Sequence, residues 1–429
     1  PTPETRGPYG SLRGVIVNPG SSRLHASTIW IDDPGPLIDF LGPADAAFLR
    51  GREGFVALGE ITRFETDSML AADRWWTDLA QTIENESEMP GRFGTGPVVY
   101  GTFCFDPTNT AHRSVLVLPE VIIGRRAGRS WLTRIGYDRV TPQLPERQPP
   151  PSRPANLRFT PGSMSESEWM ARLRDMTRRI KAGEASKVVL ARDIMAEADE
   201  PLDPRWPLRA LLSSYGACWN YLMDGLVGST PEMLVRREGG LTGSRILAGT
   251  IPRVEGVDDT QQAGRLISST KDLEEHRLAV QSVVHSWRGL LTALHVPQAP
   301  YVLTLPNVLH LATDLSGISD QRDSTLRLAE AAHPSAAVCG SPTPVARRLI
   351  AEHEVLDRGR FAGPVGWMDA QGDGEWALAL RCGQLDAEDP RRMRIFAGAG
   401  VVAASDPYAE LVETDAKMSP MKTALRGVV

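Results

Sequence analysis

Six prolines fall between Pro142 and Pro154, and this segment constrains the fold of the chain more than any other. Proline fixes φ and has no backbone N–H, so neither a helix nor a central strand can run through residues 141–161. We predict an extended connector that separates an N-terminal part, residues 1–155, from a larger C-terminal part, residues 156–429. A long proline-rich loop inside one continuous domain fits the same residues equally well, and the sequence leaves both interpretations open.

Helix signals are strong in the C-terminal part. Ser165 and Glu168 have the spacing of a capping box, which predicts that a helix begins here. Apolar residues at helical spacing predict a second helix over residues 270–294. A third helix is predicted after Asp406, because an aspartate cap followed directly by proline is a typical helix start.

Strand signals alternate with these helices. Residues 187–192 (KVVLAR) and 376–381 (WALALR) are short apolar runs of the kind that form buried strands. Because strands and helices follow one another along the chain, we predict a mixed α/β fold. The patterns do not determine the strand order.

Composition excludes several classes of protein. The 429 residues include 47 Lys and Arg against 53 Asp and Glu, so the net charge of −6 argues against a nucleic-acid binder. The first 20 residues lack the apolar run of a signal peptide, and no stretch reaches 18 consecutive apolar residues, so we expect a cytoplasmic protein without a membrane partner. The four cysteines are too far apart to indicate a zinc site or a disulfide framework: Cys104, Cys218, Cys339 and Cys382.

Two pairs of carboxylates are the most informative local feature. Asp272 and Glu275 are three residues apart on one predicted helix, and Glu410 and Glu413 repeat this spacing on another, with Lys417 one turn further on. Like charges at this spacing repel, and a hard cation such as Mg²⁺ between the two helix faces would explain them. Acidic residues near helix N-termini also stabilise helices without any metal, and spacing alone favours that ordinary interpretation.

Single residues carry weaker signals. Lys187 begins an apolar strand, where it is either a solvated strand end or a desolvated base. Glu232 follows a turn and is more often a surface carboxylate than a general acid. Gly249 and Gly400 lie in glycine-containing segments that could approach an anion, but neither segment is a phosphate loop, which argues against a Mg²⁺-dependent phosphoryl-transfer enzyme. His310 lies in an apolar run and would ordinarily be a core histidine.

Ten short motifs occur in the order of one known enzyme family. From residue 165 to the C-terminus, the chain contains KVVLAR, GSTPEMLVRR, LAGTIPR, KDLEEHRLAV, HLATDLSG, HPSAAVCGSP, RFAGPVGW, WALALRC, GAGVVAASDP and ELVETDAK. In these motifs the chain resembles the chorismate-utilising enzymes, which include isochorismate synthase, salicylate synthase, anthranilate synthase component I and aminodeoxychorismate synthase. The N-terminal 155 residues resemble the family more loosely.

The resemblance implies a fold and a site. The fold is a large, β-sandwich-like core of two sheets wrapped by helices, with Mg²⁺ and the small molecule chorismate between the sheets. Glu275 and Glu413 are expected to ligate the metal directly, and Asp272 and Glu410 through water. Arg381 is expected to hold the enolpyruvyl carboxylate of chorismate. The implied substrate-binding positions are Leu247, Gly249, Thr250, His310, Ala337, Phe361, Arg381, Gly400 and Lys417.

The resemblance also implies an activity. Family members that use ammonia have Gln where this chain has Lys187, whereas members that use water have Lys. Lys187 is therefore expected to act as the base on a water that attacks C2, while Glu232 donates a proton to the departing C4 hydroxyl. Salicylate synthases resemble one another in having Thr at the position of Ala337. Ala337 and Phe361 thus favour a Mg²⁺-dependent isomerase that stops at isochorismate.

Alternatives remain open at this point. A salicylate synthase would go on to eliminate pyruvate, and a non-catalytic relative would only bind chorismate or metal. We expect no glutamine amidotransferase subunit, because water is the nucleophile. The sequence does not distinguish a menaquinone pathway from a siderophore pathway, and a monomer is one of the oligomeric states that it leaves open.

Overall fold

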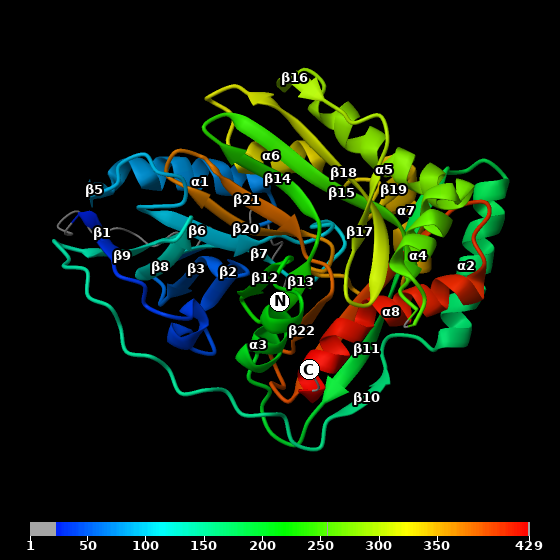
Figure 1. The fold of residues 1–429 in the computed structure, drawn as a ribbon, viewed down its shortest axis with the longest axis horizontal. Helices are drawn as coiled ribbons and strands as arrows, with labels where there is room; N and C mark the ends of the chain where they lie inside the picture. The colour runs from blue at the N-terminus through cyan, green and yellow to red at the C-terminus, as the bar shows by residue number, and fades with distance from the viewer. Residues whose placement is uncertain (1–22, 255, 428–429) are drawn as a thin grey trace, which may run out of the picture.

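The computed structural model describes residues 23–254 and 256–427, so the N-terminal segment that was searched for a targeting signal lies outside the described residues. Two large sheets form the centre, and helices pack around them (Figure 1). The predicted mixed α/β fold with two sheets is confirmed. None of the described helices is long and apolar enough to cross a membrane.

The first sheet has 13 strands and contains strands from both sides of the proline-rich connector. Strand β19 (Gly340–Ser341) pairs with β11 at one end of the sheet. The other strands lie in this order: β10 (Arg158–Pro161), β11 (Lys187–Glu197), β23 (Arg392–Val401), β22 (Cys382–Leu385), β13 (Leu226–Thr230), β12 (Trp219–Met223), β2 (Ala46–Arg50), β3 (Glu53–Leu58), β8 (Val121–Arg126), β9 (Arg129–Tyr137), β1 (Leu24–Ile31) and β5 (Glu84–Ser87).

The second sheet has 10 strands and also contains strands from both sides of the connector. Strand β17 (Tyr301–Thr304) pairs with β18 outside the main path. The order of the other strands is β16 (Leu291–His295), β18 (Val308–Ser319), β15 (Leu241–Pro252), β14 (Met233–Glu238), β21 (Gly374–Leu378), β20 (Pro364–Asp369), β6 (Val98–Thr102), β7 (Ser114–Leu118) and β4 (Thr62–Thr66).

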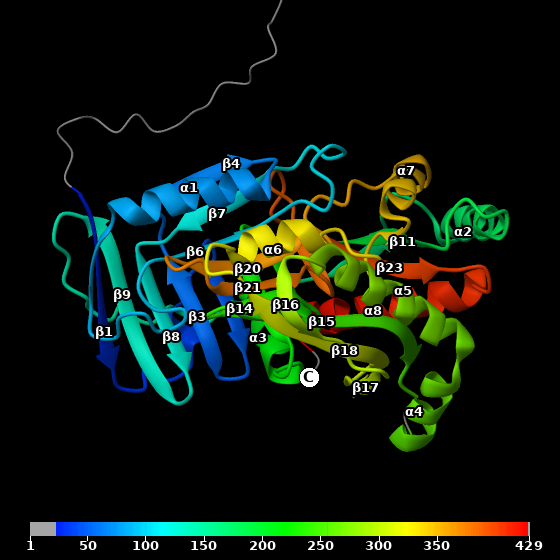
Figure 2. The same cartoon turned by 90° about the horizontal axis from the view of Figure 1, so that it is seen from above.

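The helices cover the outer faces and ends of these sheets, and the views in Figures 1 and 2 show α1, α6 and α7 on one side and α8 on another. A short 3₁₀ helix (Leu37–Phe40) precedes β2. The α-helices are α1 (Met69–Thr82), α2 (Glu166–Lys181), α3 (Arg205–Ser214), α4 (Asp259–Ser268), α5 (Thr270–Trp287), α6 (Thr325–Ala332), α7 (Thr343–His353) and α8 (Pro407–Arg426).

The proline-rich connector joins β9 to β10 along the edge of the molecule, and residues 138–157 contain no helix or strand (Figure 1). This agrees with the extended conformation that its prolines impose. The pairings β12–β2 and β20–β6 join strands from the two sides of the connector within each sheet. The division of the chain at residue 155 stays a prediction.

The capping signals determine where two helices begin. The Ser165 side chain accepts from the backbone of Glu168, whose carboxylate accepts from the Ser165 backbone, so the predicted capping box forms at α2. At α8, the Asp406 side chain accepts from the Ala409 N–H, as the sequence predicts. These hydrogen bonds fix the residue at which each helix begins.

Two predicted elements are too long. Helix α5 ends at Trp287 rather than at residue 294, because Gly289 has a φ of +88° and the chain then turns into the edge strand β16. Strand β21 ends at Leu378 rather than at residue 381, because residues 379–381 carry the chain from the second sheet to the first. Arg381 lies at this crossing with a φ of +50°.

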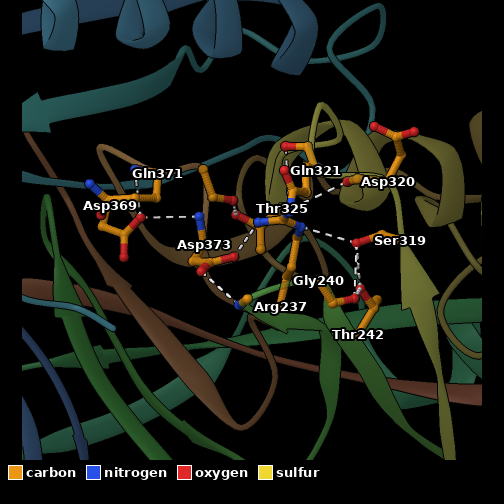
Figure 3. Close-up of polar contacts among 12 residues, drawn as sticks. Arg237, Gly240, Thr242, Ser319, Asp320, Gln321, Thr325, Asp369, Gln371 and Asp373 are labelled. Carbon is orange, nitrogen blue, oxygen red and sulfur yellow. Dashed lines mark hydrogen bonds and ion pairs between the residues drawn. The ribbon is translucent and has the colours of Figure 1, made fainter. Parts of the chain in front are cut away.

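A buried polar network joins strand ends of the second sheet (Figure 3). Arg237 on β14 forms an ion pair with Asp373 and donates from Nε to Ser319 Oγ at 3.0 Å. Asp369 accepts from the backbone N–H groups of Gln371 and Asp373, which shapes the turn between β20 and β21. The network therefore ties three strand ends together through one guanidinium.

We expect Arg237→Met to lower the free energy of unfolding by about 3–5 kcal/mol, because it leaves the buried Asp373 carboxylate without its ion-pair partner. Urea denaturation followed by circular dichroism measures this loss. Arg322→Met is the matched control: Arg322 is exposed and pairs with the exposed Asp320, so its removal should cost less than about 1 kcal/mol. Equal losses in the two variants would contradict this role.

Candidate active site

The candidate site lies between the two sheets, where the chain crosses from one to the other. Glu232 lies between β13 of the first sheet and β14 of the second, and Arg381 lies between β21 and β22 at a second crossing. Both side chains are buried. Two connections between sheets therefore place an acid and a guanidinium in the same interior space.

A cavity occupies this space. Ten of the sequence-predicted residues line it: Glu232, Leu247, Thr250, Glu275, His310, Ala337, Phe361, Arg381, Gly400 and Lys417. The remaining five do not line it: Lys187, Gly249, Asp272, Glu410 and Glu413. The fold thus brings together residues that are up to 230 positions apart in the sequence.

Lys187 begins β11 and is fully buried, so the solvated strand end considered from the sequence is excluded. Its Nζ lies 3.1 Å from Glu275 Oε1. A Cβ added to Gly400 on the neighbouring strand β23 would lie 2.9 Å from Lys187 Cε and 2.1 Å from Glu275 Oε1. Glycine at position 400 is therefore what allows this amine and this carboxylate to meet.

Glu232 is the acid of the cavity. Burial raises its pKa to about 8, although the Leu247 backbone hydrogen bond and the charges of Lys187, Lys417 and Arg381 act in the opposite direction. The carboxyl group is therefore largely protonated at neutral pH. A protonated carboxyl that lines a cavity can donate a proton to a bound molecule.

A hydrogen-bonded chain orients Arg381. Its Nη2 donates to His310 Nε2 at 2.7 Å, and His310 Nδ1 lies 2.8 Å from Thr250 Oγ1. Burial and the Arg381 charge hold the pKa of His310 well below its usual range, so the ring is neutral. Because a guanidinium can only donate, Nε2 accepts and Nδ1 carries the proton towards Thr250.

Arg381 has a free donor in this arrangement. Its Nη1 is buried and finds no hydrogen-bond partner among residues 23–254 and 256–427. An unpaired buried guanidinium nitrogen is costly unless it meets an anion. The arrangement therefore favours a ligand that carries a carboxylate.

The four predicted metal-binding carboxylates come from α5 and α8, and all are buried. Asp272 packs against Gly249, where a bulge in β15 gives the glycine a φ of +76°. Burial and the charge of Glu413 raise the pKa of Glu410 to about 7, which indicates that the two helices bring their negative charges close together.

Three lysines contact carboxylates of this cluster. Lys187 pairs with Glu275, Lys417 Nζ lies 2.6 Å from Glu413 Oε1, and Lys271 Nζ lies 2.6 Å from Glu410 Oε1. Among residues 23–254 and 256–427, no group of three or more His, Cys, Asp or Glu side chains is already arranged to hold a metal ion. The donor chemistry nevertheless fits a hard divalent cation, since every donor is a carboxylate oxygen and the negative charges are buried.

The sequence matches the family model described as chorismate binding enzyme over residues 49–426. The chain belongs to the chorismate-binding enzymes. DhbC of Bacillus subtilis, an isochorismate synthase, is 34% identical over 342 residues, which cover 77% of this chain and 81% of DhbC. EntC of Escherichia coli K12, also an isochorismate synthase, is 34% identical over 334 residues, which cover 76% of this chain and 80% of EntC.

The fold of this chorismate-binding enzyme also matches a solved structure. MenF, the menaquinone-specific isochorismate synthase from Escherichia coli, matches with a TM-score of 0.77 and 25% identity, covering 94% of this chain and 95% of MenF. The family resemblance inferred from the ten motifs is thereby confirmed. The individual residue roles stay predictions.

Two residues near the site of this chorismate-binding enzyme were missed by sequence reasoning. Arg358 lines the cavity and donates hydrogen bonds to the backbone oxygens of Val189 and Val338, which line the cavity as well. Lys271 pairs with Glu410. Lys271 directly precedes Asp272 in the KDLEEH motif, and this position was the only signal that could have found it.

Proposed function

We propose that this chain is an isochorismate synthase that converts chorismate to isochorismate. The observation that carries the proposal is a buried acid, Glu232, and the unpaired guanidinium nitrogen of Arg381 in one cavity, with a buried amine, Lys187, in contact with the lining residue Glu275. The relatives DhbC and EntC, both isochorismate synthases, support the same reaction. This reaction adds one water and releases another, so it is a net isomerisation.

In the proposed reaction, Lys187 in its neutral form removes a proton from a water molecule. The water oxygen forms a bond to C2 of the ring, the ring double bonds shift, and the bond from C4 to its hydroxyl breaks. Glu232 gives its proton to the departing hydroxyl, which leaves as water. A proton then passes through solvent from Lys187 to the Glu232 carboxylate. This transfer restores both groups to their starting protonation states.

We propose that Mg²⁺ is the cofactor and that Glu275 and Glu413 bind it directly, with Asp272 and Glu410 acting through water. When bound, Mg²⁺ supplies positive charge that holds a substrate carboxylate. Lys417 contacts Glu413 and the backbone oxygen of Gly398, so its ammonium group is fixed at the edge of the cavity and adds to this positive charge.

The other polar residues of the cavity hold and orient chorismate. Arg381 binds the enolpyruvyl carboxylate through its unpaired Nη1, while His310 fixes the guanidinium through Nε2. Thr250 accepts from His310, so its hydroxyl proton is free to be donated to substrate. The phenyl ring of Phe361 stacks on Phe396 at 5.1 Å and forms an apolar wall.

The proposed reaction stops at isochorismate because Ala337 presents only a methyl group to the cavity. A salicylate synthase would release pyruvate, so an assay coupled to lactate dehydrogenase distinguishes the two activities. We expect isochorismate without pyruvate. The cytoplasmic location and the absence of an amidotransferase subunit stay predictions.

The pH dependence of turnover tests the role of Glu232. Glu232 donates only while protonated, so we expect kcat/KM to fall as the pH rises through about 8, the raised pKa of this group in the free protein. Glu232→Gln cannot donate a proton, and we expect kcat to fall by about 10²- to 10⁴-fold and this alkaline limb to disappear.

Glu238→Gln is the matched control, because Glu238 ends β14, the strand that directly follows Glu232, but is exposed and pairs with surface arginines. Its kcat and pH profile should equal those of the wild type. A Glu232→Gln enzyme with wild-type turnover and an unchanged alkaline limb would rule out Glu232 as the acid.

A further inference from the structure

Lys271 joins the two helices that carry the carboxylates. It lies in the first turn of α5, next to Asp272, and its Nζ reaches 2.6 Å from Glu410 Oε1 on α8. Glu410 itself is almost completely buried, with 1% of its side chain exposed. One ammonium group therefore bridges the helices from which both carboxylate pairs project.

Lys271 differs in position from the other two lysines of the cluster. Lys417 lines the cavity, and Lys187 contacts the lining residue Glu275. Lys271 does not line the cavity, and 26% of its side chain is exposed. It therefore acts on the cluster from the outer side, with no route to substrate.

The electrostatics of the cluster depend on this residue. Lys271 Nζ forms an ion pair with Glu410 Oε1 at 2.6 Å, and Lys271 directly precedes Asp272 in α5. Its ammonium group therefore places a positive charge beside the carboxylate cluster. A divalent cation that uses these carboxylates has to share them with this charge.

We propose that Lys271 sets the affinity of the site for its divalent cation, by competing for Glu410 and keeping the metal exchangeable. This inference rests on the proposed metal site. Removing the ammonium group leaves the same carboxylates with one positive charge fewer, so the cation should bind more tightly. Because Lys271 is partly exposed, solvent screens part of the effect, and we expect Kd to fall about tenfold.

The test is a titration of the full-length protein with Mn²⁺, followed by the electron paramagnetic resonance signal of the free ion. Lys271→Met and Lys271→Gln remove the charge, and two neutral variants guard against a folding defect in either one. Lys271→Arg keeps the charge. Lys422→Met is the matched control, since Lys422 lies on α8 beside the Phe159 ring and away from the cluster.

We expect Lys271→Met and Lys271→Gln to bind Mn²⁺ about tenfold more tightly than the wild type, and the other two variants to bind like the wild type. If the wild type binds Mn²⁺ but the neutral variants bind equally or more weakly, the inference about Lys271 is overturned and the metal site stands. If the wild type itself does not bind Mn²⁺, the proposed metal site is overturned as well.

Discussion

Replacing Lys187 with alanine should lower kcat by about 10³-fold, because the attacking water then has no base. The side chain is fully buried, and its nitrogen lies 3.1 Å from Glu275. Water that enters the space left by the side chain cannot replace a positioned amine. The rate of isochorismate formation measures the loss, and tryptophan fluorescence on addition of chorismate shows whether binding persists.

Lys181→Ala is the control, since Lys181 is an exposed lysine at the end of α2 and should leave kcat unchanged. Lys187→Met fills more of the space and removes only the amine, so it serves as a second variant if the alanine protein is unstable. Full turnover by either folded Lys187 variant would contradict the proposed mechanism.

A single methyl group at position 400 should have the second largest effect. The added Cβ would lie 2.1 Å from Glu275 Oε1 and 2.9 Å from Lys187 Cε, so both groups have to move. Displacement of catalytic groups by about 1 Å can cost about 10²-fold in rate, and we expect a loss of this size in kcat/KM for Gly400→Ala. Mn²⁺ affinity should fall in parallel, because Glu275 is a proposed ligand.

Gly398→Ala separates this steric effect from a general loss of strand structure. Gly398 lies on the same strand, and its added Cβ would meet Val189 Cγ1 at 3.2 Å, the Leu190 backbone oxygen at 3.5 Å and Ala191 Cα at 3.9 Å. We expect kcat/KM of this variant to stay within about threefold of the wild type. Equal losses in the two variants would mean that the close approach at Gly400 is not the cause.

Local signals in the sequence were sufficient for the elements that begin with a cap. The starts of α2 and α8 follow from Ser165 and Asp406, because each helix begins with its own side-chain hydrogen bonds. The end of α5 did not follow. Leu290, Leu291 and Leu294 continue the apolar spacing of the helix, but in the structure Leu291 begins an edge strand that pairs with β18. Tertiary pairing outweighs local spacing there.

The site itself could be predicted only in part from the residues. Spacing showed that Asp272 and Glu275 share a helix face, but only the fold places α5 opposite α8. Glu232 looked like a surface carboxylate, because its burial depends on a crossing between two sheets that no local pattern reveals. The family resemblance supplied this long-range information through the order of its motifs.

The ion pairs of the site were the part that was hardest to predict from the sequence. The sequence placed Lys417 one turn from Glu413, and these side chains do pair. It gave no indication that Lys187 meets Glu275 or that Lys271 meets Glu410, since these pairs are 88 and 139 residues apart. Long-range ion pairs depend on packing, and their consequences for pKa values could not be foreseen.

The most direct test of the proposed function is to incubate the purified protein with chorismate, in Mg²⁺ or in EDTA, and to separate the products by chromatography. We expect isochorismate as the only product, formed with Mg²⁺ and not with EDTA. Salicylate together with pyruvate would show that Ala337 does not stop the reaction at isochorismate. No conversion of chorismate with Mg²⁺ would contradict the proposed function.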